Sequence, residues 1–381
     1  MIEKLKQAYG ILFPPKKDVV RLKPKGSSRG CVAISYITWP FLEGVDSPKM
    51  RGHTNAYEVT AMAQAFLDLG FRVEVCDWKN DVYMPPSDCV IAIDIHFNLE
   101  RWSKSLPSKT KKIFHATGPH WIDCNLSELN RLKEIQIRKN FVLKPRRQVE
   151  YSRIAEIADH ISVLGNDYTI ASYEFLGKPI TRIPISSAYD FEWPATRDFS
   201  VAKKHFLWVS SYGMVWKGLD IVLDAFSEMP ELNLTVCGRP EKEEDFFNLY
   251  RKALLSSANI KFIGWMDMAS PEFCEIARTH ASIVHVASSE GGGGSAIHCM
   301  HAGLLPICTR ETSVDLGDFG ALVEVPTVEC LKSKCREIAA LPEAQIEARA
   351  RKACEHVRRF HTRDEFARNY ADFSRSIVDS L

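Results

Sequence analysis

The sequence predicts an α/β protein of two Rossmann-like, doubly wound domains with a cleft between them. The chain has 381 residues, more than one hydrophobic core usually organises, so two domains are expected. Short apolar runs alternate with longer amphipathic stretches, as in parallel strands joined by helices. This alternation stops in a polar, Pro-containing stretch at 186–204 and then starts again, which places a linker there.

The first series of elements begins after a basic N-terminal extension, residues 1–30, and forms an N-terminal domain over 31–190. Its alternating runs predict strands at 31–37, 72–76, 89–95, 112–115 and 158–164. Helices are expected at 55–69, 126–139 and 167–175, the first of them ended by Gly70.

The second series forms a C-terminal domain over 200–358. Strands are expected at 206–209, 232–237, 260–263, 281–286 and 305–309, and helices at 218–226, 245–255, 271–278 and 295–302. The last segment, about 343–381, is helical in pattern. Its aromatic stripe is typical of core packing and comprises Phe360, Phe366, Tyr370 and Phe373.

Composition narrows the class of protein. Hydrophobic residues make up 45% and charged residues 25%, as in ordinary globular proteins, and the net charge of +1 gives no field that would recruit nucleic acid. Eleven cysteines form no CxxC pair, which favours free thiols in a reducing compartment. The start lacks the order of a secretory signal, and no apolar run reaches the roughly 18 to 20 residues that span a bilayer. We therefore expect a cytoplasmic protein.

Two clusters of basic residues stand out against this balance. They are either solvated surface charge or a peripheral contact with an anionic membrane, where each basic residue adds about 1 kcal/mol. The first cluster comprises Lys4, Lys6, Lys16, Lys17, Arg21, Lys23, Lys25 and Arg29, and the second Lys133, Arg138, Lys139, Lys144, Arg146 and Arg147.

A glycine-rich segment at 283–306 is the most informative stretch. An apolar strand leads to Glu290, then to four glycines, Gly291–Gly294, and then to an apolar helix. Backbone N–H groups of glycines and of a helix N-terminus can cradle a phosphate, and a glutamate beside them can accept hydrogen bonds from sugar hydroxyls. The alternative is a flexible loop with a solvated glutamate. The strand before it favours binding, because ligands of α/β sheets lie beyond the carboxyl ends of strands.

A second segment, 207–220, has the same strand, loop and helix order. Its loop holds Ser211, Gly213 and Lys217. A lysine there can neutralise a diphosphate, and one charge-assisted hydrogen bond contributes about 1.5 to 3 kcal/mol. A lone lysine before a glycine is more often surface charge, so the binding interpretation depends on its pairing with the glycine-rich segment.

Together these segments resemble the donor-binding domain of retaining glycosyltransferases with the GT-B fold, the group 1 family. That family has a lysine-glycine helix start after the first C-domain strand, and later a glutamate followed by seven residues and a second glutamate. Segment 208–226 is similar to the first motif, and segment 288–306 to the second, with a Gly-x-x-Pro turn at 303–306. The resemblance covers most of the chain and implies that the final helices, from about 359 to 381, cross back to the N-terminal domain.

The resemblance also implies roles in binding a nucleotide-sugar donor. Lys217 would bind the diphosphate, while Glu290 and the glycine amides would hold the transferred sugar and phosphate. Two positions depart from the family: His298 replaces the second glutamate, and Ser211 replaces an arginine, for which Arg239 is a candidate substitute. The implied donor site comprises Ser211, Gly213, Lys217, Arg239, Glu290, Gly292, Gly293, Gly294, Ser295 and His298.

The N-terminal half is expected to face the acceptor. Segment 52–58 resembles the glycine-containing loop that opens toward the reaction centre, which implicates His53 and Asn55, although Thr54 or Asn55 could simply cap a helix. Segment 113–121 resembles the family's strand-end Phe-His. It suggests His115 as a catalytic residue beside Glu290 and Lys217, and His120 on the acceptor side.

No metal or other cofactor is expected. His298, Cys299 and His301 lack an evident third ligand, no Asp-x-Asp occurs, and no Ser or Cys nucleophile pattern is present. Three hypotheses follow: a retaining transferase in which the departing diphosphate helps deprotonate the acceptor, a nucleotide-sugar epimerase or hydrolase, and a catalytically weakened scaffold partner. The acceptor, whether a glycan, a lipid-linked sugar or a small molecule, is not encoded in any readable motif.

Overall fold

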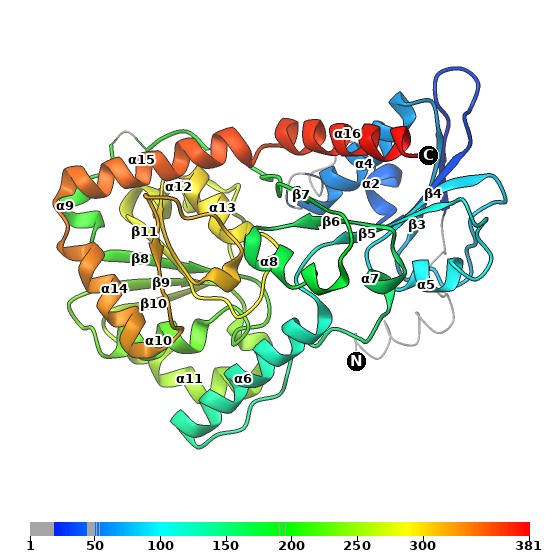
Figure 1. Ribbon diagram of the computed structural model, residues 1–381. Coiled ribbons are helices and arrows are strands. Elements are labelled where there is room, and N and C mark those ends of the chain that lie inside the picture. Colours follow the sequence, from blue (N-terminus) through cyan, green and yellow to red (C-terminus); the bar gives the residue numbers. More distant parts are fainter. Residues whose placement is uncertain (1–18, 44–49, 51, 53, 190, 195) are drawn as a thin grey trace.

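The computed structural model describes residues 19–43, 50, 52, 54–189, 191–194 and 196–381. Figure 1 shows two α/β domains side by side, each built on a mainly parallel sheet. The predicted fold class is confirmed.

The N-terminal domain contains seven strands in the order β1-β3-β2-β4-β5-β6-β7. They are β1 (Val19–Leu22), β2 (Cys31–Tyr36), β3 (Arg72–Asp77), β4 (Cys89–Asp94), β5 (Lys111–Ala116), β6 (His160–Leu164) and β7 (Ile180–Ile183). Its helices are α2 (Trp39–Glu43), α4 (Thr54–Asp68), α5 (Asn98–Trp102), α6 (Trp121–Lys139), α7 (Ile154–Ile157) and α8 (Asp167–Ala171).

Two strands of this sheet were not predicted. Strand β1 pairs antiparallel with β3, so residues 19–22 belong to the domain and not to the basic extension. Its Val-Val-Arg-Leu sequence suits an edge strand, because one face is partly covered by the core while Arg21 stays in solvent. Strand β7 lies at the opposite edge and pairs in parallel with β6.

The C-terminal domain contains six parallel strands in the order β10-β9-β8-β11-β12-β13. They are β8 (His205–Val209), β9 (Asn233–Cys237), β10 (Ile260–Gly264), β11 (Ser282–His285), β12 (Leu305–Cys308) and β13 (Ala321–Leu322). Its helices are α9 (Phe199–Ala202), α10 (Leu219–Ser227), α11 (Glu244–Ser256), α12 (Pro271–Thr279), α13 (Gly294–His301), α14 (Val328–Ala340) and α15 (Glu343–Phe360).

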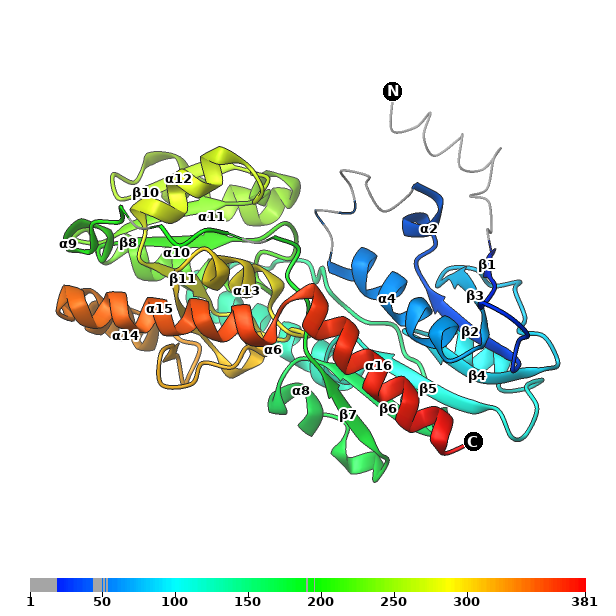
Figure 2. The ribbon, with the colours of Figure 1, turned by 90° about the horizontal axis from the view of Figure 1, so that it is seen from above.

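The last helix, α16 (Arg363–Asp379), returns to the N-terminal domain (Figures 1 and 2). Its buried side chains Phe366, Tyr370 and Phe373 join the N-terminal core beside α4, as the aromatic stripe predicted. Phe360 does not belong to this stripe, because it ends α15 and is 40% exposed.

Helix α6 ties the two domains together through charges. Arg138 lies 2.9 Å from Asp220, Lys139 lies 2.6 Å from Asp224, and Arg146 pairs with Asp245. Three of the six basic residues of the second cluster are therefore neutralised by the C-terminal domain. None of the described helices combines the length and the apolar character that crossing a membrane requires.

Candidate functional site

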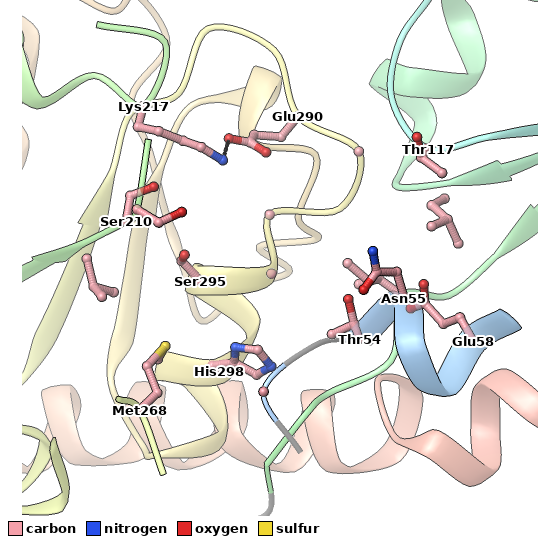
Figure 3. Close-up of a pocket in the computed structure, with 18 of the residues that line it drawn as sticks. Thr54, Asn55, Glu58, Thr117, Ser210, Lys217, Met268, Glu290, Ser295 and His298 are labelled. Atoms are coloured by element: carbon pink, nitrogen blue, oxygen red, sulfur yellow. Dashed lines mark hydrogen bonds and ion pairs between the residues drawn. The ribbon is translucent and has the colours of Figure 1, made fainter. Parts of the chain in front are cut away.

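A cavity of about 1170 Å³ lies between the carboxyl ends of the strands of the two sheets. Figure 3 shows its two walls, with Lys217, Glu290, Ser295 and His298 on one side and Asn55 and Thr117 on the other. The C-terminal wall is lined by Val209, Ser210, Ser211, Lys217, Cys237, 265–269, Glu290, Gly291, Gly293, Gly294, Ser295 and His298. The N-terminal wall is lined by Tyr36, Gly52, Thr54, Asn55, Glu58, Trp78, Ile95, His96, Thr117, Arg147 and Leu164.

The strand order explains why Lys217 and Glu290 meet. Strands β8 and β11 are neighbours at the point where the strand order reverses, so the loops that follow them open onto one crevice. The two loops are hydrogen-bonded, since the Ser288 amide donates to the Trp216 carbonyl at 2.8 Å. The ammonium of Lys217 donates to Oε1 of Glu290 (Figure 3).

The lysine-glycine helix start has a steric reason. Gly218 has a φ of +75°, a left-handed conformation that favours glycine. A Cβ at this position would lie 2.3 Å from the carbonyl oxygen of Val286, so a larger residue would push the two loops apart. Gly218 therefore keeps Lys217 close to the loop that carries Glu290.

Glu290 is an ionised carboxylate inside the cavity wall. Burial raises the pKa of this carboxyl, but the ammonium of Lys217 and the neighbouring His285 outweigh burial and lower the pKa to about 2. His285, at the end of β11, is fully buried with Nε2 3.8 Å from Oε1 of Glu290. Burial lowers the pKa of His285, which keeps its ring neutral.

The glycine turn brings the two walls together. A Cβ on Gly291 would lie 2.0 Å from the carbonyl oxygen of Thr117 in the opposite domain. Gly293, with φ +53°, is the N-cap of α13, and Gly293, Gly294 and Ser295 all line the cavity. Gly292 does not line it and packs beside Ile185, so its contact with the donor stays a prediction without support from the cavity lining.

Two further predicted donor contacts lie outside the cavity lining. The amide of Gly213 is occupied, because it donates to the buried carboxylate of Glu243 at 2.6 Å. Arg239 does not line the cavity itself, but its guanidinium carbon lies 4.8 Å from the ring centroid of Trp265, which does. Ser211 lines the cavity together with Lys217. The donor contacts of these residues stay predictions.

His298 lines the cavity but binds the linker. Its Nε2 accepts a hydrogen bond of 2.8 Å from the amide of Ala188, and burial lowers its pKa to about 3. The imidazole is therefore neutral, and the position offers no carboxylate to a ribose.

His115 lies away from both chambers, so the structure gives no support to its predicted catalytic role. The side chain is fully buried and lines neither cavity. Its Nδ1 lies 2.9 Å from the hydroxyl of Ser162, its ring packs edge-on against Tyr36 and Tyr370, and burial lowers its pKa to about 4. His115 lies within β5 and packs on Tyr370 of α16, while Thr117 lies beyond the end of the strand and lines the cavity.

A second chamber of about 620 Å³ adjoins the first, and both are lined by Thr117, Arg147, Glu290 and Gly291. His120, which caps α6, lies in it. Its Nδ1 accepts from the Ile122 amide at 3.4 Å, and its Nε2 has no hydrogen-bond partner among the residues that the structure places. The aromatic residues that line this chamber are Trp78, Phe97, Phe114, Trp121, Tyr173, Tyr212 and Trp216.

The N-terminal wall contains two charged residues to which the sequence analysis gave no role. Glu58 is buried, and its Oε1 accepts from both the amide and the hydroxyl of Ser186, at 3.2 and 3.0 Å. Burial raises the pKa of Glu58 to about 7, although the hydrogen bonds from Ser186 lower it. Arg147 lines both chambers. Asn55 lines the larger chamber, so its predicted position on the acceptor side stays a prediction, and His53 lies outside the described residues.

No group of three or more His, Cys, Asp or Glu residues in the described part of the chain is arranged to hold a metal ion. His298 and His301 each bind backbone instead, the latter with Nε2 3.1 Å from the carbonyl oxygen of His361.

Comparisons with known proteins agree with this architecture. Residues 193–352 match the family Glycosyl transferases group 1. No curated protein is significantly similar in sequence.

Solved structures share the fold over most of the chain. Sucrose-phosphate synthase from Thermosynechococcus elongatus has a TM-score of 0.61 at 13% identity, covering 93% of this chain and 100% of that one. Anabaena Alr3699/HepE, solved with UDP and glucose, has a TM-score of 0.56 at 11% identity, covering 91% and 99%. S. aureus TarM, with a TM-score of 0.52 at 12% identity, is matched over 74% of this chain and 54% of its own length, so the chain spans about half of TarM. The protein thus has the GT-B fold of glycosyltransferases, and its C-terminal domain matches their group 1 family.

Proposed function

We propose that the protein is a glycosyltransferase that takes a sugar from a nucleotide-diphosphate donor bound in the larger chamber. The observation that carries the proposal is the convergence of Lys217, Glu290 and the glycine turn on one cavity. The chamber volume of about 1170 Å³ suits a ligand at least as large as a drug-sized molecule. The similarity of Alr3699/HepE, solved with UDP and glucose, supports this class of donor.

Each part of the wall has a chemical task in this proposal. The Lys217 ammonium and the amides of Gly293 to Ser295 contact the diphosphate, and the Glu290 carboxylate accepts hydrogen bonds from the sugar. The acceptor oxygen bonds to the anomeric carbon as the bond to the diphosphate breaks, and the departing diphosphate oxygen takes the acceptor proton. Lys217 and the amides stabilise the charge of the departing diphosphate, so the reaction needs no metal. Because the acceptor attacks the anomeric carbon from the side of the leaving group, the anomeric configuration is retained.

The second chamber is the proposed acceptor subsite. It meets the donor chamber at Glu290 and Gly291, so an acceptor there reaches the transferred sugar. Aromatic rings offer flat apolar faces to a sugar ring, and the unpartnered Nε2 of His120 offers it a hydrogen bond. In this proposal His120 lies beside the acceptor.

Peripheral membrane contact stays a prediction, and α6 is the surface that supports it. Four large apolar side chains are exposed along the helix around Lys133: Ile122, Leu126, Leu129 and Ile137. Such a stripe is typical of helices that lie at a lipid surface. Co-sedimentation with anionic vesicles compares the wild type with a Leu126→Ser, Ile137→Ser double variant. If the wild type binds the vesicles no better than the double variant, the membrane contact is rejected.

Two alternatives use the same fold. An epimerase or hydrolase would bind the donor in the same way, and the neutral His298 motivates a catalytically weakened partner protein. A thermal-shift screen with UDP, GDP, ADP and CMP, with and without sugars, identifies the nucleotide, because binding stabilises the folded state. Incubation with nucleotide sugars then separates the functions: a glycosylated acceptor supports the transferase, while free nucleotide alone, an epimer or no binding contradicts it.

Lys217→Ala tests the site itself. We expect the affinity for the nucleoside diphosphate to fall about tenfold or more by calorimetric titration. Lys252→Ala, on the exposed face of α11, is the charge-matched control. Lys217→Ala leaves the negative charge of the buried Glu290 without its cation. A double variant, Lys217→Ala with Glu290→Gln, therefore removes the negative charge of Glu290 as well. Unchanged affinity in both variants would remove Lys217 from the site.

A further inference from the structure

Arg147 reaches the donor chamber from the opposite domain. It lies in the segment between α6 and α7, where the backbone is fixed by the buried carboxylate of Glu128. Glu128 accepts from the Arg147 amide at 2.9 and 3.1 Å, from the Arg146 amide at 2.7 Å and from the side chain of Gln148 at 2.8 Å. The start of the Arg147 side chain is therefore held in one place.

The side chain then crosses to the loop that carries Ser211 and Lys217. A Cβ on Gly213 would lie 2.8 Å from Cγ of Arg147, so the arginine packs directly on that glycine. Its guanidinium carbon lies 5.7 Å from the ring centroid of the buried Trp216. The absence of a side chain at Gly213 is what leaves room for Arg147 above the loop.

The charges around Arg147 leave it without a partner. Lys217 is neutralised by Glu290, and Arg138, Lys139 and Arg146 each pair with a carboxylate of the C-terminal domain. Over the residues with described positions, Arg147 makes no ion pair, yet it lines the chamber. The positive charge of Arg147 is therefore not neutralised by a described carboxylate and is available to a bound anion.

We propose that Arg147 is the second cation for the donor diphosphate, supplied by the N-terminal domain. The inference rests on the proposed function. Ser211 leaves the C-terminal loop without the arginine that the resemblance leads one to expect, and Arg147 lies over that same loop. An arginine fork can make two parallel hydrogen bonds to a phosphate, which a lysine cannot. The diphosphate is then held from both domains at once.

The test compares nucleoside diphosphate with monophosphate. Calorimetric titrations use UDP and UMP, or the GDP or ADP pair if the thermal-shift screen selects it, with wild type, Arg147→Ala and Arg147→Lys. Lys133→Ala, an exposed residue of α6, is the control. We expect Arg147→Ala to weaken the diphosphate about tenfold and the monophosphate less than threefold, with partial recovery in Arg147→Lys and no change in the control.

The outcomes separate the two proposals. If wild type binds the diphosphate and Arg147→Ala binds it equally well, the role of Arg147 is wrong while the proposed function stands. An equal loss for diphosphate and monophosphate would show only a structural role and would also overturn the inference. If wild type binds none of the nucleotides, the proposed function fails, and the role of Arg147 fails with it.

Discussion

The two walls of the cleft are built in different ways. The C-terminal wall is built around two short loops after adjacent strands, which are hydrogen-bonded to each other and joined by the Lys217–Glu290 ion pair. The N-terminal wall is assembled from side chains of separate segments, among them Glu58, Thr117 and Arg147. The first wall is held together by contacts within its own domain, and the second depends on how the domains pack. Substitutions on the C-terminal wall should therefore affect chemistry most, and those where the N-terminal wall takes part should affect donor affinity, geometry or stability.

The largest effect is expected for Glu290→Gln. The amide keeps the shape but loses the negative charge, so turnover should fall about 100-fold, or about 2.7 kcal/mol, while the affinity for the nucleotide alone stays nearly intact. Steady-state kinetics and titration with the nucleotide measure the two quantities. The exposed Glu324→Gln is the control. Loss of nucleotide binding itself would show that Glu290 does not lie on the sugar side.

An intermediate effect is expected where the walls touch. In Gly291→Ala the new Cβ would meet the Thr117 carbonyl at 2.0 Å, so the domains must move apart, and turnover should fall about tenfold. Gly118→Ala is the comparison that adds a methyl group to the facing loop, which lines the second chamber, without a clash between the walls, since nothing lies within 4 Å of a Cβ at that position. Equal activity of the two variants would mean that this contact is absent during turnover.

The smallest effect is on stability and comes from Glu58. The Glu58 carboxyl has a pKa of about 7 in the folded protein, compared with an ordinary value of 4.5 in the unfolded chain. Between pH 4.5 and 7 the folded chain therefore keeps a proton that the unfolded chain releases. The free energy of unfolding therefore falls as pH rises from 4.5 through 7, by at most about 3 kcal/mol. Several buried histidines have lowered pKa values and act in the opposite direction, so the difference from Glu58→Gln is the quantity to measure. Denaturant unfolding from pH 4 to 8 should show the variant gaining stability relative to wild type, and parallel profiles would contradict this.

The sequence predicted the C-terminal wall better than the N-terminal one for a physical reason. Lys217 and Glu290 each follow a strand in a local motif, so the motifs and the family resemblance were enough to predict them in one site, and the sheet does bring their strands together. The position of His115 depended on which face of the sheet α16 would cover, and a strand-end histidine carries no local sign of that. Arg147 looked like its basic neighbours in the sequence, and only domain packing separates it from those that pair with carboxylates.

Glycines show the same limit at a finer scale. Four consecutive glycines predicted a turn that could approach a phosphate, and Gly293 and Gly294 do line the cavity. The sequence could not show that Gly292 packs beside Ile185, or that Gly213 makes room for Arg147. Such roles arise from contacts with residues far away in the chain.

A crystal structure of the complex with the preferred nucleoside diphosphate tests the central claim most directly. We expect Nζ of Lys217 and the amides of Gly293 to Ser295 to lie within hydrogen-bond distance of the same diphosphate, between the two domains. A diphosphate bound outside the cleft, or contacting only one of these two elements, would contradict the account.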